Sequence, residues 1–482
     1  MAERIPLPIP LGFYEAVSPP LASNTCVNWL PIIPEAAALN NSALIQREGL
    51  AQFGLGGDGA CRGGDTLAGV PFFVNGSRLV SVDSNGSSVD RGIISGSGRV
   101  SLANNGTELV IVVPGGDAFV WTGTSLVQIT DPDYQTSDTV SFYRGFFVFT
   151  TTDGKQLFVS NLSAPLTFSG LDFGSAEGDP DRIVTQVLDH DELSIIGERT
   201  TEVFKLVGGV GFPLAIIPGA YTEKGSAAKF GVVKFDNSYL FIGGGVNEQP
   251  AIWRQASSSN AVKVSTDAID LAMQKFTKEE IAEAFAMTYS QRGQFLAVFT
   301  INSTRIPSVT FVYNSTATAL SGQRVWSTFQ TGVNLNSWRV SAIVKAYGKF
   351  LCGDAIDERI GELDAEIFTD YEDTLFRQCT LQPFSNNGTT IFEGEFEAGF
   401  EAGVGLTGKD SPMIAMEYSN DGARTFKYKT ARDIGKIGEY GHRSVWKRQG
   451  SFPVSRIIRL TVTDPVKANL NRLAATPEIG VD

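Results

Sequence analysis

The most regular hydrophobic pattern in the chain lies between residues 286 and 332. Three segments, residues 294–299, 308–313 and 324–329, are short and rich in β-branched and aromatic residues, which favour strands. Gly, Asn, Ser and Thr separate them, and these residues favour turns because they tolerate unusual backbone angles or bond their own backbone. The pattern predicts a meander of antiparallel strands.

Similar pairs of apolar segments recur before and after this meander. Residues 70–82 hold two such segments around Asn75 and Gly76, and an Asn-Gly pair between strands is a strong signal for a hairpin. The units start about 40 to 50 residues apart, which is the period of four-stranded propeller blades. Six blades, or seven, fit between Gly64 and Asp364.

A helical pattern interrupts the strands at about residues 266–286. Thr277 and Glu280 have the spacing of a capping box, in which each side chain bonds the backbone N–H of the other residue. Ile281, Ala284 and Phe285 follow at helical spacing. We expect this small helical insertion to pack its apolar face on the side of the propeller.

Length and composition indicate several all-β domains. A chain of 482 residues is longer than a single core usually grows. Its 19% of charged residues and 51 glycines suit short strands joined by tight turns. We expect an irregular N-terminal arm (residues 1–63) that packs on the C-terminal domain or on a neighbouring subunit, a β-propeller (residues 64–365) and a C-terminal β-sandwich-like domain (residues 366–482).

One segment of the C-terminal region has an unusual pattern for a core strand. Residues 393–397 alternate acidic and apolar side chains before a Gly-rich stretch. Charged strands are typical of sheet edges, where they prevent pairing with other chains. The pattern therefore predicts an edge strand or a protruding ribbon.

Charge is distributed unevenly along the chain. The net charge is −13, but residues 409–472 hold 13 Lys and Arg against 6 Asp and Glu, a local balance of +7 that leaves −20 for the rest. This asymmetry predicts a body that repels polyanions, joined to a region that attracts an acidic partner; the alternative is a solvated basic face without a partner. The candidate docking residues are Lys427, Lys429, Arg432, Lys436, Lys447 and Arg448.

The sequence holds little catalytic chemistry. Its two histidines, His190 and His442, fall in different expected domains, so neither a Ser-His-Asp triad nor a His-rich metal site is expected. Asp189, Asp191 and Glu192 surround His190 and have donor atoms for a cation, but the position reads as an inter-strand turn, where charges are common. We predict no catalytic residue, no cofactor and no metal site.

Four cysteines form no C-x-x-C pair, which indicates reduced, space-filling thiols rather than a disulfide framework. The apolar runs are far shorter than the roughly 20 residues of a membrane helix. Prolines at positions 6, 8 and 10 interrupt the first apolar stretch, so no export signal is expected.

Two alternative functions come from single features. Residues 419–426 resemble the Asp-box turn of sialidases and related glycosidases, which makes a glycan-active β-propeller hydrolase acting on host surface polysaccharide the enzyme alternative. In that family the turn is structural and remote from the active site, and a glycosidase also needs paired carboxylates, or a Tyr nucleophile, at a fixed separation. A DNA-binding module is opposed by the isoelectric point near 4.9.

Loose motifs recur along the whole chain, at residues 26–29, 49–50, 264–269, 289–299, 310–313, 325–326, 417–422, 438–441, 445–448 and 460–466. Together they resemble the phage stabilisation protein family. These are the tail nozzle, or tail hub, proteins of short-tailed phages (podoviruses), also called packaged DNA stabilisation proteins. The chain departs from the family pattern at Glu48, where Pro is expected before Gly49, and at Ala423 and His442.

The resemblance implies a structural virion protein of a bacteriophage tail, made in the bacterial host cytoplasm, and not an enzyme. It implies a hexameric ring that extends the portal-adaptor channel, retains the packaged DNA and conducts it at ejection. The implied partners are the head-to-tail adaptor ring, a tail spike or fibre and a tail needle or plug, with no stable membrane insertion.

The charge pattern agrees with such a channel. Genomic DNA would pass without sequence-specific binding, and an acidic wall suits this because each Lys or Arg that neutralised a phosphate would add affinity. The basic C-terminal region is then expected to bind the adaptor ring.

Overall fold

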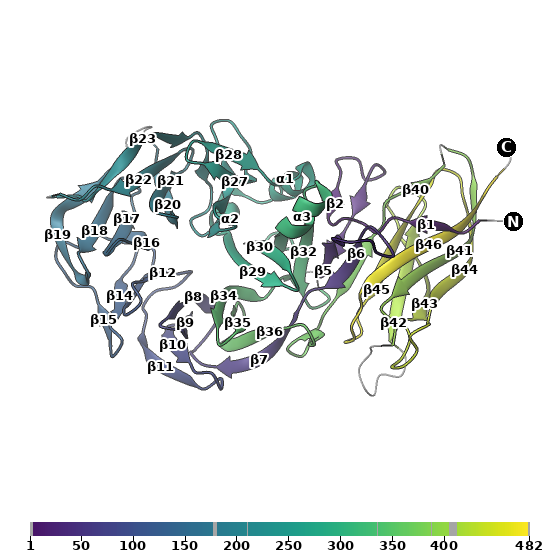
Figure 1. Cartoon of the computed structure of the whole chain (residues 1–482), viewed down its shortest axis with the longest axis horizontal. Helices are drawn as coiled ribbons and strands as arrows, with labels where there is room; N and C mark the ends of the chain where they lie inside the picture. Colours follow the sequence, from purple (N-terminus) through teal and green to yellow (C-terminus); the bar gives the residue numbers. More distant parts are fainter. Residues whose placement is uncertain are drawn as a thin grey trace.

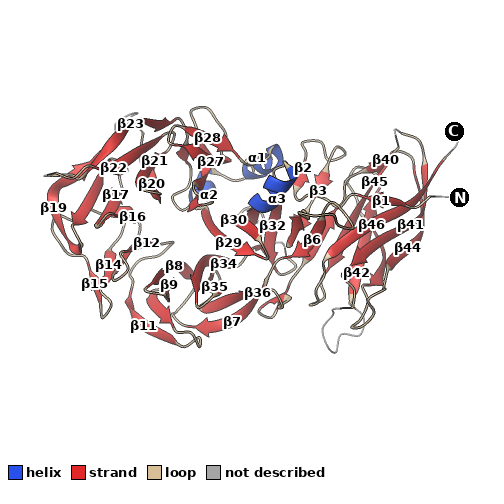
Figure 2. Ribbon diagram, in the orientation of Figure 1, coloured by secondary structure: helices blue, strands red, loops and turns tan. Residues whose placement is uncertain are grey.

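The computed structural model describes residues 3–176, 181–209, 211–334, 336–386, 388–403 and 412–480. These residues fold mainly into strands, which form a ring of sheets at one end of the molecule and a layered β domain at the other (Figure 1). Helices are few and short; two lie where the ring meets the layered domain, and one lies farther into the ring (Figure 2). The all-β class expected from the sequence is confirmed.

Five antiparallel sheets follow one another along the chain between Cys61 and Lys263. In each, strands adjacent in sequence pair with each other, except that β24 pairs with β26. The first three sheets are β8 (Cys61–Leu67), β9 (Val70–Asn75), β10 (Arg78–Val82) and β11 (Ser88–Ile93); β12 (Ser101–Asn104), β13 (Leu109–Val112), β14 (Ala118–Trp121) and β15 (Leu126–Gln128); and β16 (Ser137–Tyr143), β17 (Phe146–Thr151), β18 (Leu157–Asn161) and β19 (Ala164–Gly174). The next two are β20 (Ile183–Asp189), β21 (Glu192–Gly197), β22 (Thr201–Leu206) and β23 (Leu214–Thr222); and β24 (Gly225–Ser226), β25 (Val232–Lys234), β26 (Tyr239–Gly244), β27 (Ala251–Ser257) and β28 (Asn260–Lys263).

Two further groups of strands complete the ring. The first is the expected meander, β29 (Phe285–Gln291), β30 (Gln294–Ile301), β31 (Val309–Asn314) and β32 (Trp326–Thr331), with the short β33 (Asn336–Ser337). The second joins β34 (Val340–Ala346), β35 (Lys349–Asp354) and β36 (Arg359–Asp364) to β7 (Gly49–Leu55), beside which lie β37 (Thr369–Asp370) and β38 (Asp373–Thr374).

The ring is closed by a strand from the N-terminal part of the chain. β7 pairs antiparallel with β36, from Gly49 opposite Asp364 to Leu55 opposite Arg359. The innermost strands contact each other in a complete cycle, in the order β8, β12, β16, β20, β25, β29, β34 and again β8. Because this cycle contains seven inner strands, it favours seven blades over six. The blade count itself stays a prediction.

Helices α1 (Asp267–Met273) and α2 (Lys278–Ala282) form the expected helical insertion. The capping box at Thr277 and Glu280 is present, and Ile269, Met273 and Ile281 are buried against the propeller core. Helix α3 (Ser315–Ser321), between β31 and β32, was not expected from the sequence. None of the helices in the described part of the chain is long and apolar enough to cross a membrane.

The layered domain packs two sheets around one core. Trp29, Phe396 and Trp446 from one sheet meet Met416 and Leu460 from the other. One sheet holds β44 (Ser444–Phe452), β41 (Ile391–Phe400), β46 (Leu470–Ile479), β6 (Ala43–Gln46) and β5 (Trp29–Ile32), with β1 (Ile5–Leu7) beside β46. The other holds β4 (Cys26–Val27), β39 (Arg377–Thr380), β45 (Ser455–Val462), β42 (Met413–Ser419) and β43 (Lys427–Asp433), with β40 (Phe384–Ser385) beside β45; β2 (Tyr14–Glu15) and β3 (Ser23–Asn24) form a separate hairpin.

Residues 5–55 supply strands to both halves of the molecule. β1, β5 and β6 join the layered domain, and β7 joins the ring. β4 links the two halves directly, because it pairs with β32 on one side and with β39 on the other. The domain limits at residues 63 and 365 stay a prediction.

The edge position expected for residues 393–397 is wrong. These residues belong to β41, which lies between β44 and β46 with hydrogen bonds on both sides. Glu393 and Glu397 are almost fully buried, and arginines from elsewhere in the fold pair with them. A strand with alternating acids is therefore stable inside this sheet, although its sequence pattern is typical of an edge.

Candidate functional site

The six candidate docking residues, here called the basic edge, gather where the outer strands of the two sandwich sheets meet. β43 and β44 are these outer strands, and they contact each other. Arg432 Nε donates to the Val445 carbonyl at 2.8 Å, and Trp446 Nε1 donates to the Thr430 carbonyl at 2.7 Å. The basic edge consists of Lys427, Lys429 and Arg432 on β43, Lys436 in the following loop, and Lys447 and Arg448 on β44.

The charges of the basic edge are not neutralised locally. Among the described residues, no carboxylate lies within ion-pair distance of any of the six side chains. Lys427, Lys436, Lys447 and Arg448 are exposed, whereas Lys429 places its ammonium 5.0 Å from the centre of the Tyr418 ring. The basic edge is therefore a set of cations without an ion pair among the described residues, five on β43 and β44 and one in the loop after β43.

Other cations of the same region are already paired. Arg459 binds Glu417 at 2.7 Å inside the window of residues 409–472, but several pairs use acids from outside it. The local balance of +7 therefore overstates how many cations of this window are unpaired. The alternating acids of β41 were the sequence signal that carboxylates from outside the window pair with some of these cations. The pairs that cross the window boundary are Arg443 and Arg472 with Glu397, Arg456 with Glu393, and Lys467 with Glu401.

A buried ion pair joins the propeller to the sandwich. Arg47, just after β6, directs Nη1 and Nη2 to the two carboxylate oxygens of Asp370, at 2.9 and 2.5 Å. Both side chains are fully buried. Arg47 Nε also donates to Asn28 Oδ1 at 2.8 Å, and Thr331 Oγ1 donates to Asp370 at 3.0 Å. This network fixes the chain where it passes from one domain to the other, and no sequence pattern marked it.

Glu48, the next residue, has an unusual environment. One of its carboxylate oxygens is buried without a hydrogen-bond partner among the described residues. Burial raises the pKa of Glu48 to about 7, although Arg292 opposes the rise. The carboxyl group therefore titrates near neutral pH at the joint between the domains.

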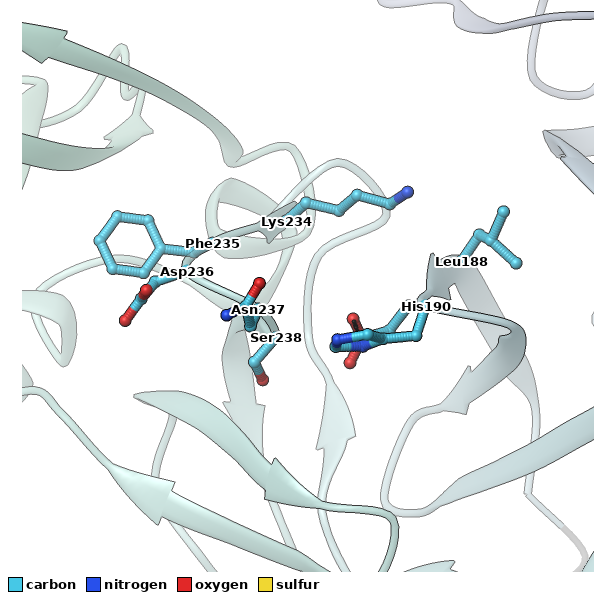
Figure 3. A pocket seen from close by; sticks show the side chains of 8 residues that line it. Leu188, His190, Lys234, Phe235, Asp236, Asn237 and Ser238 are labelled. Carbon is cyan, nitrogen blue, oxygen red and sulfur yellow. Dashed lines mark ion pairs between the residues drawn. The ribbon is translucent and has the colours of Figure 1, made fainter.

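The two histidines do not share a site. His190 lies on the turn between β20 and β21, with φ 52° and Nδ1 2.9 Å from Asp189 Oδ1. It lines a hollow of about 270 Å³, and its ring points toward residues 236–238 on the opposite wall (Figure 3). His442 lies in the sandwich, where its Nε2 is 2.9 Å from the Asp433 carbonyl. The described residues contain no group of three or more His, Cys, Asp or Glu arranged for a metal ion.

The Asp-box-like turn is held together by its own side chains. Asp421 accepts hydrogen bonds from Ser419 Oγ at 2.7 Å and from the Thr425 N–H at 2.9 Å, and it also accepts from the Thr425 hydroxyl. These bonds lower the pKa of Asp421 far below its usual range. The carboxylate thus serves to close the turn between β42 and β43.

All four cysteines are buried free thiols. Burial raises the pKa of Cys26 to about 12 and that of Cys61 to about 11, which keeps both thiols protonated and unreactive.

Comparison with known families matches both halves of the chain. Residues 5–368 match the family described as Bacteriophage P22 Gp10, beta-propeller, and residues 377–478 match Bacteriophage P22 Gp10, beta-sandwich. The chain belongs to the bacteriophage P22 Gp10 family. The resemblance stated from the sequence and the combination of propeller and sandwich are thereby confirmed.

One curated relative and several solved structures are similar to this Gp10-family chain. Tail hub protein gp10 of Salmonella phage P22 is 22% identical over 374 residues, covering 74% of this chain and 76% of the relative. The extracellular domain of BT4673 from B. thetaiotaomicron has a TM-score of 0.42 at 7% identity, covering 86% of this chain and 60% of that one. BamB from Moraxella catarrhalis has a TM-score of 0.37 at 9% identity, covering 71% and 97%. These structural scores are too low to support a functional comparison.

Proposed function

We propose that this Gp10-family chain is a structural tail hub protein of a phage virion. The observation that carries the proposal is the family match to both domains, together with the relative named as a tail hub protein. The candidate site agrees with a structural role, because its distinctive features are the unpaired cations of the basic edge, which suit a protein contact, and the buried Arg47–Asp370 pair, which holds the two domains together.

We further propose that six copies assemble into a nozzle ring that continues the portal-adaptor channel, retains packaged DNA and conducts it at ejection. Such a ring needs subunits that hold their shape under load. The Arg47–Asp370 network and the continuous pairing of β32, β4 and β39 support a rigid subunit. The surplus of acids outside residues 409–472 supports a wall along which DNA slides.

The basic edge is the proposed contact with an acidic face of the head-to-tail adaptor ring. Its support is that none of these cations forms an ion pair among the described residues, so carboxylates of a partner could pair with them. A tail spike or fibre and a tail needle or plug are the other proposed partners.

The mass of the purified protein, alone and mixed with the adaptor ring of its phage, tests this function. Light scattering or native mass spectrometry is expected to show six copies joined to the adaptor ring. If the protein stays a monomer, does not bind the adaptor ring and releases reducing sugar from host surface polysaccharide, the tail hub proposal is wrong and the glycan hydrolase is favoured instead.

A further inference from the structure

The outer face of the six-stranded sandwich sheet carries an arginine cluster, defined as Arg4, Arg443 and Arg472. Arg4 precedes β1, Arg443 precedes β44 and Arg472 belongs to β46; β44 and β46 flank β41, and β1 pairs with β46, near the chain termini (Figure 1). All three guanidinium groups converge on Glu397, at the centre of β41. Because side chains alternate along a strand, Glu397 points away from the core that contains its neighbours Phe396 and Ala398.

This cluster has more donors than acceptors. Arg443 Nε donates to Glu397 Oε2 at 2.7 Å, and Arg4 and Arg443 share that oxygen, while Arg472 bonds Oε1. Each guanidinium has five N–H donors, and a carboxylate has only two oxygens. Glu397 is 1% exposed, but the three arginine side chains are 39%, 45% and 40% exposed, so a part of each arginine faces solvent.

The charges are also unbalanced. Glu395 lies 3.6 Å from Arg443 and is the other carboxylate within ion-pair distance of the cluster among the described residues. Burial opposes ionisation of Glu397, but hydrogen bonds from Arg443 and Arg4 and the attraction of Arg4 and Arg472 outweigh it, so its pKa lies below the usual value. Three cations thus face two anions, and Arg472 Nε is buried without a partner among the described residues.

We propose that the arginine cluster binds a carboxylate from an acidic segment of a partner protein, which sits over the three guanidinium groups beside Glu397. Guanidinium forks bind carboxylates through paired, charge-assisted hydrogen bonds. None of the three arginines belongs to the basic edge. The cluster also acts within one chain, so this inference does not depend on ring assembly or on the adaptor.

A short acidic peptide fits the cluster better than DNA does. Salt screens charges over about 8 Å at physiological ionic strength, so a peptide that touches only the cluster meets its local positive charge. A duplex spans far more surface than the cluster, so its affinity would depend on the whole of a chain with net charge −13. The recognised chemistry is therefore a protein carboxylate.

The test measures binding of fluorescein-labelled hexaglutamate to the full chain by fluorescence anisotropy at low salt. Arg443→Ala and Arg472→Ala are expected to weaken binding at least about tenfold, the loss of one charge-assisted contact. Arg4→Ala changes a residue that precedes β1 and lies outside the strands, so it guards against misfolding of the other variants, and it is expected to act in the same direction. The matched control is Arg78→Ala, which removes an arginine of similar exposure (38%) from an ion pair on the propeller and is expected to leave binding unchanged.

Loss of binding in the cluster variants with retention in Arg78→Ala supports the proposal. Absence of hexaglutamate binding to the natural chain overturns it, as does an equal loss in Arg78→Ala. Tighter binding of a short DNA duplex through the same arginines overturns the assignment to a protein partner. A chain that binds the peptide through the cluster but never forms a ring would contradict only the proposed function.

Discussion

Arg47 and Asp370 form a fully buried, two-pronged ion pair across 323 positions of sequence, at the point where the chain passes from the sandwich to the propeller. Each carboxylate oxygen of Asp370 receives one guanidinium nitrogen, and Asn28 and Thr331 satisfy further polar atoms. The pair and Thr331 therefore tie the residue that follows β6 to β32 and β37, which adds a side-chain joint to the backbone link that β4 makes between the two halves.

Removing one member of this pair is expected to destabilise the protein strongly. Asp370→Ala leaves the Arg47 charge buried without its counter-ion, which costs about 3–5 kcal/mol in the free energy of unfolding. Denaturant unfolding of the variant measures this loss. Asp90→Ala is the matched control, because it breaks a half-exposed pair with Arg78 and should cost no more than about 1 kcal/mol. Equal losses in the two variants would show that the joint is not stabilised by this pair.

Ring closure by β7 is expected to control the stability of the last blade. Ala51→Pro removes a backbone donor from the ladder between β7 and β36, where Ala51 lies opposite Glu362, and should cost about 1–3 kcal/mol. Hydrogen exchange is then expected to accelerate first in β36 and β35. Ala37→Pro, in an exposed loop, is the control and should leave these strands protected. Uniform acceleration throughout the ring would contradict a local closing role.

The sequence predicted what depends on near neighbours in the chain. The hairpin at Asn75 and Gly76 and the capping box at Thr277 and Glu280 both form, because each needs only residues a few positions apart. Helix α3 was missed, although Asn314 caps its start and Gly322, with φ 69°, ends it. Both signals were present, but the surrounding Ser and Thr residues also favour a turn.

Features that depend on distant residues were not predictable in this way. The strand β41 was assigned to an edge because its acids are visible in the sequence, whereas Arg456, which neutralises Glu393 at 2.7 Å, lies 63 positions away. The pairing of β7 with β36 spans about 300 residues, and neither strand specifies its partner by pattern. The basic edge was found from charge alone, but only the fold separates its free cations from the paired ones.

Glu48 is expected to make stability depend on pH near neutrality. Burial raises its pKa from 4.5 to about 7 in the folded chain, so the folded state holds a proton that the unfolded state has lost. Its contribution is therefore complete below about pH 4.5 and is lost as pH rises toward 7, by roughly 2 kcal/mol after allowance for partial exposure.

Glu48→Gln, which stays neutral, should remove this pH dependence and raise the melting temperature at pH 8. Glu366→Gln is the control, since this carboxyl also faces Arg292 but is 77% exposed. The measurement is the melting temperature of all three proteins between pH 5 and 8, approximate limits chosen to bracket the titration. A natural chain whose stability rises over this interval relative to Glu48→Gln would contradict the assignment.

The basic edge is expected to determine affinity for the adaptor ring. The triple variant Lys427→Glu, Lys447→Glu and Arg448→Glu reverses three exposed cations without removing a hydrogen bond of the fold, and should weaken adaptor binding at least about tenfold. Binding of the natural chain should also weaken as salt increases, because exposed charges are screened. The matched control reverses three exposed lysines of the propeller, Lys155, Lys205 and Lys234. Light scattering of each protein mixed with the adaptor ring reports the result. If the sandwich variant binds as well as the natural chain, the free cations of β43 and β44 serve another partner, and the arginine cluster becomes the next surface to test.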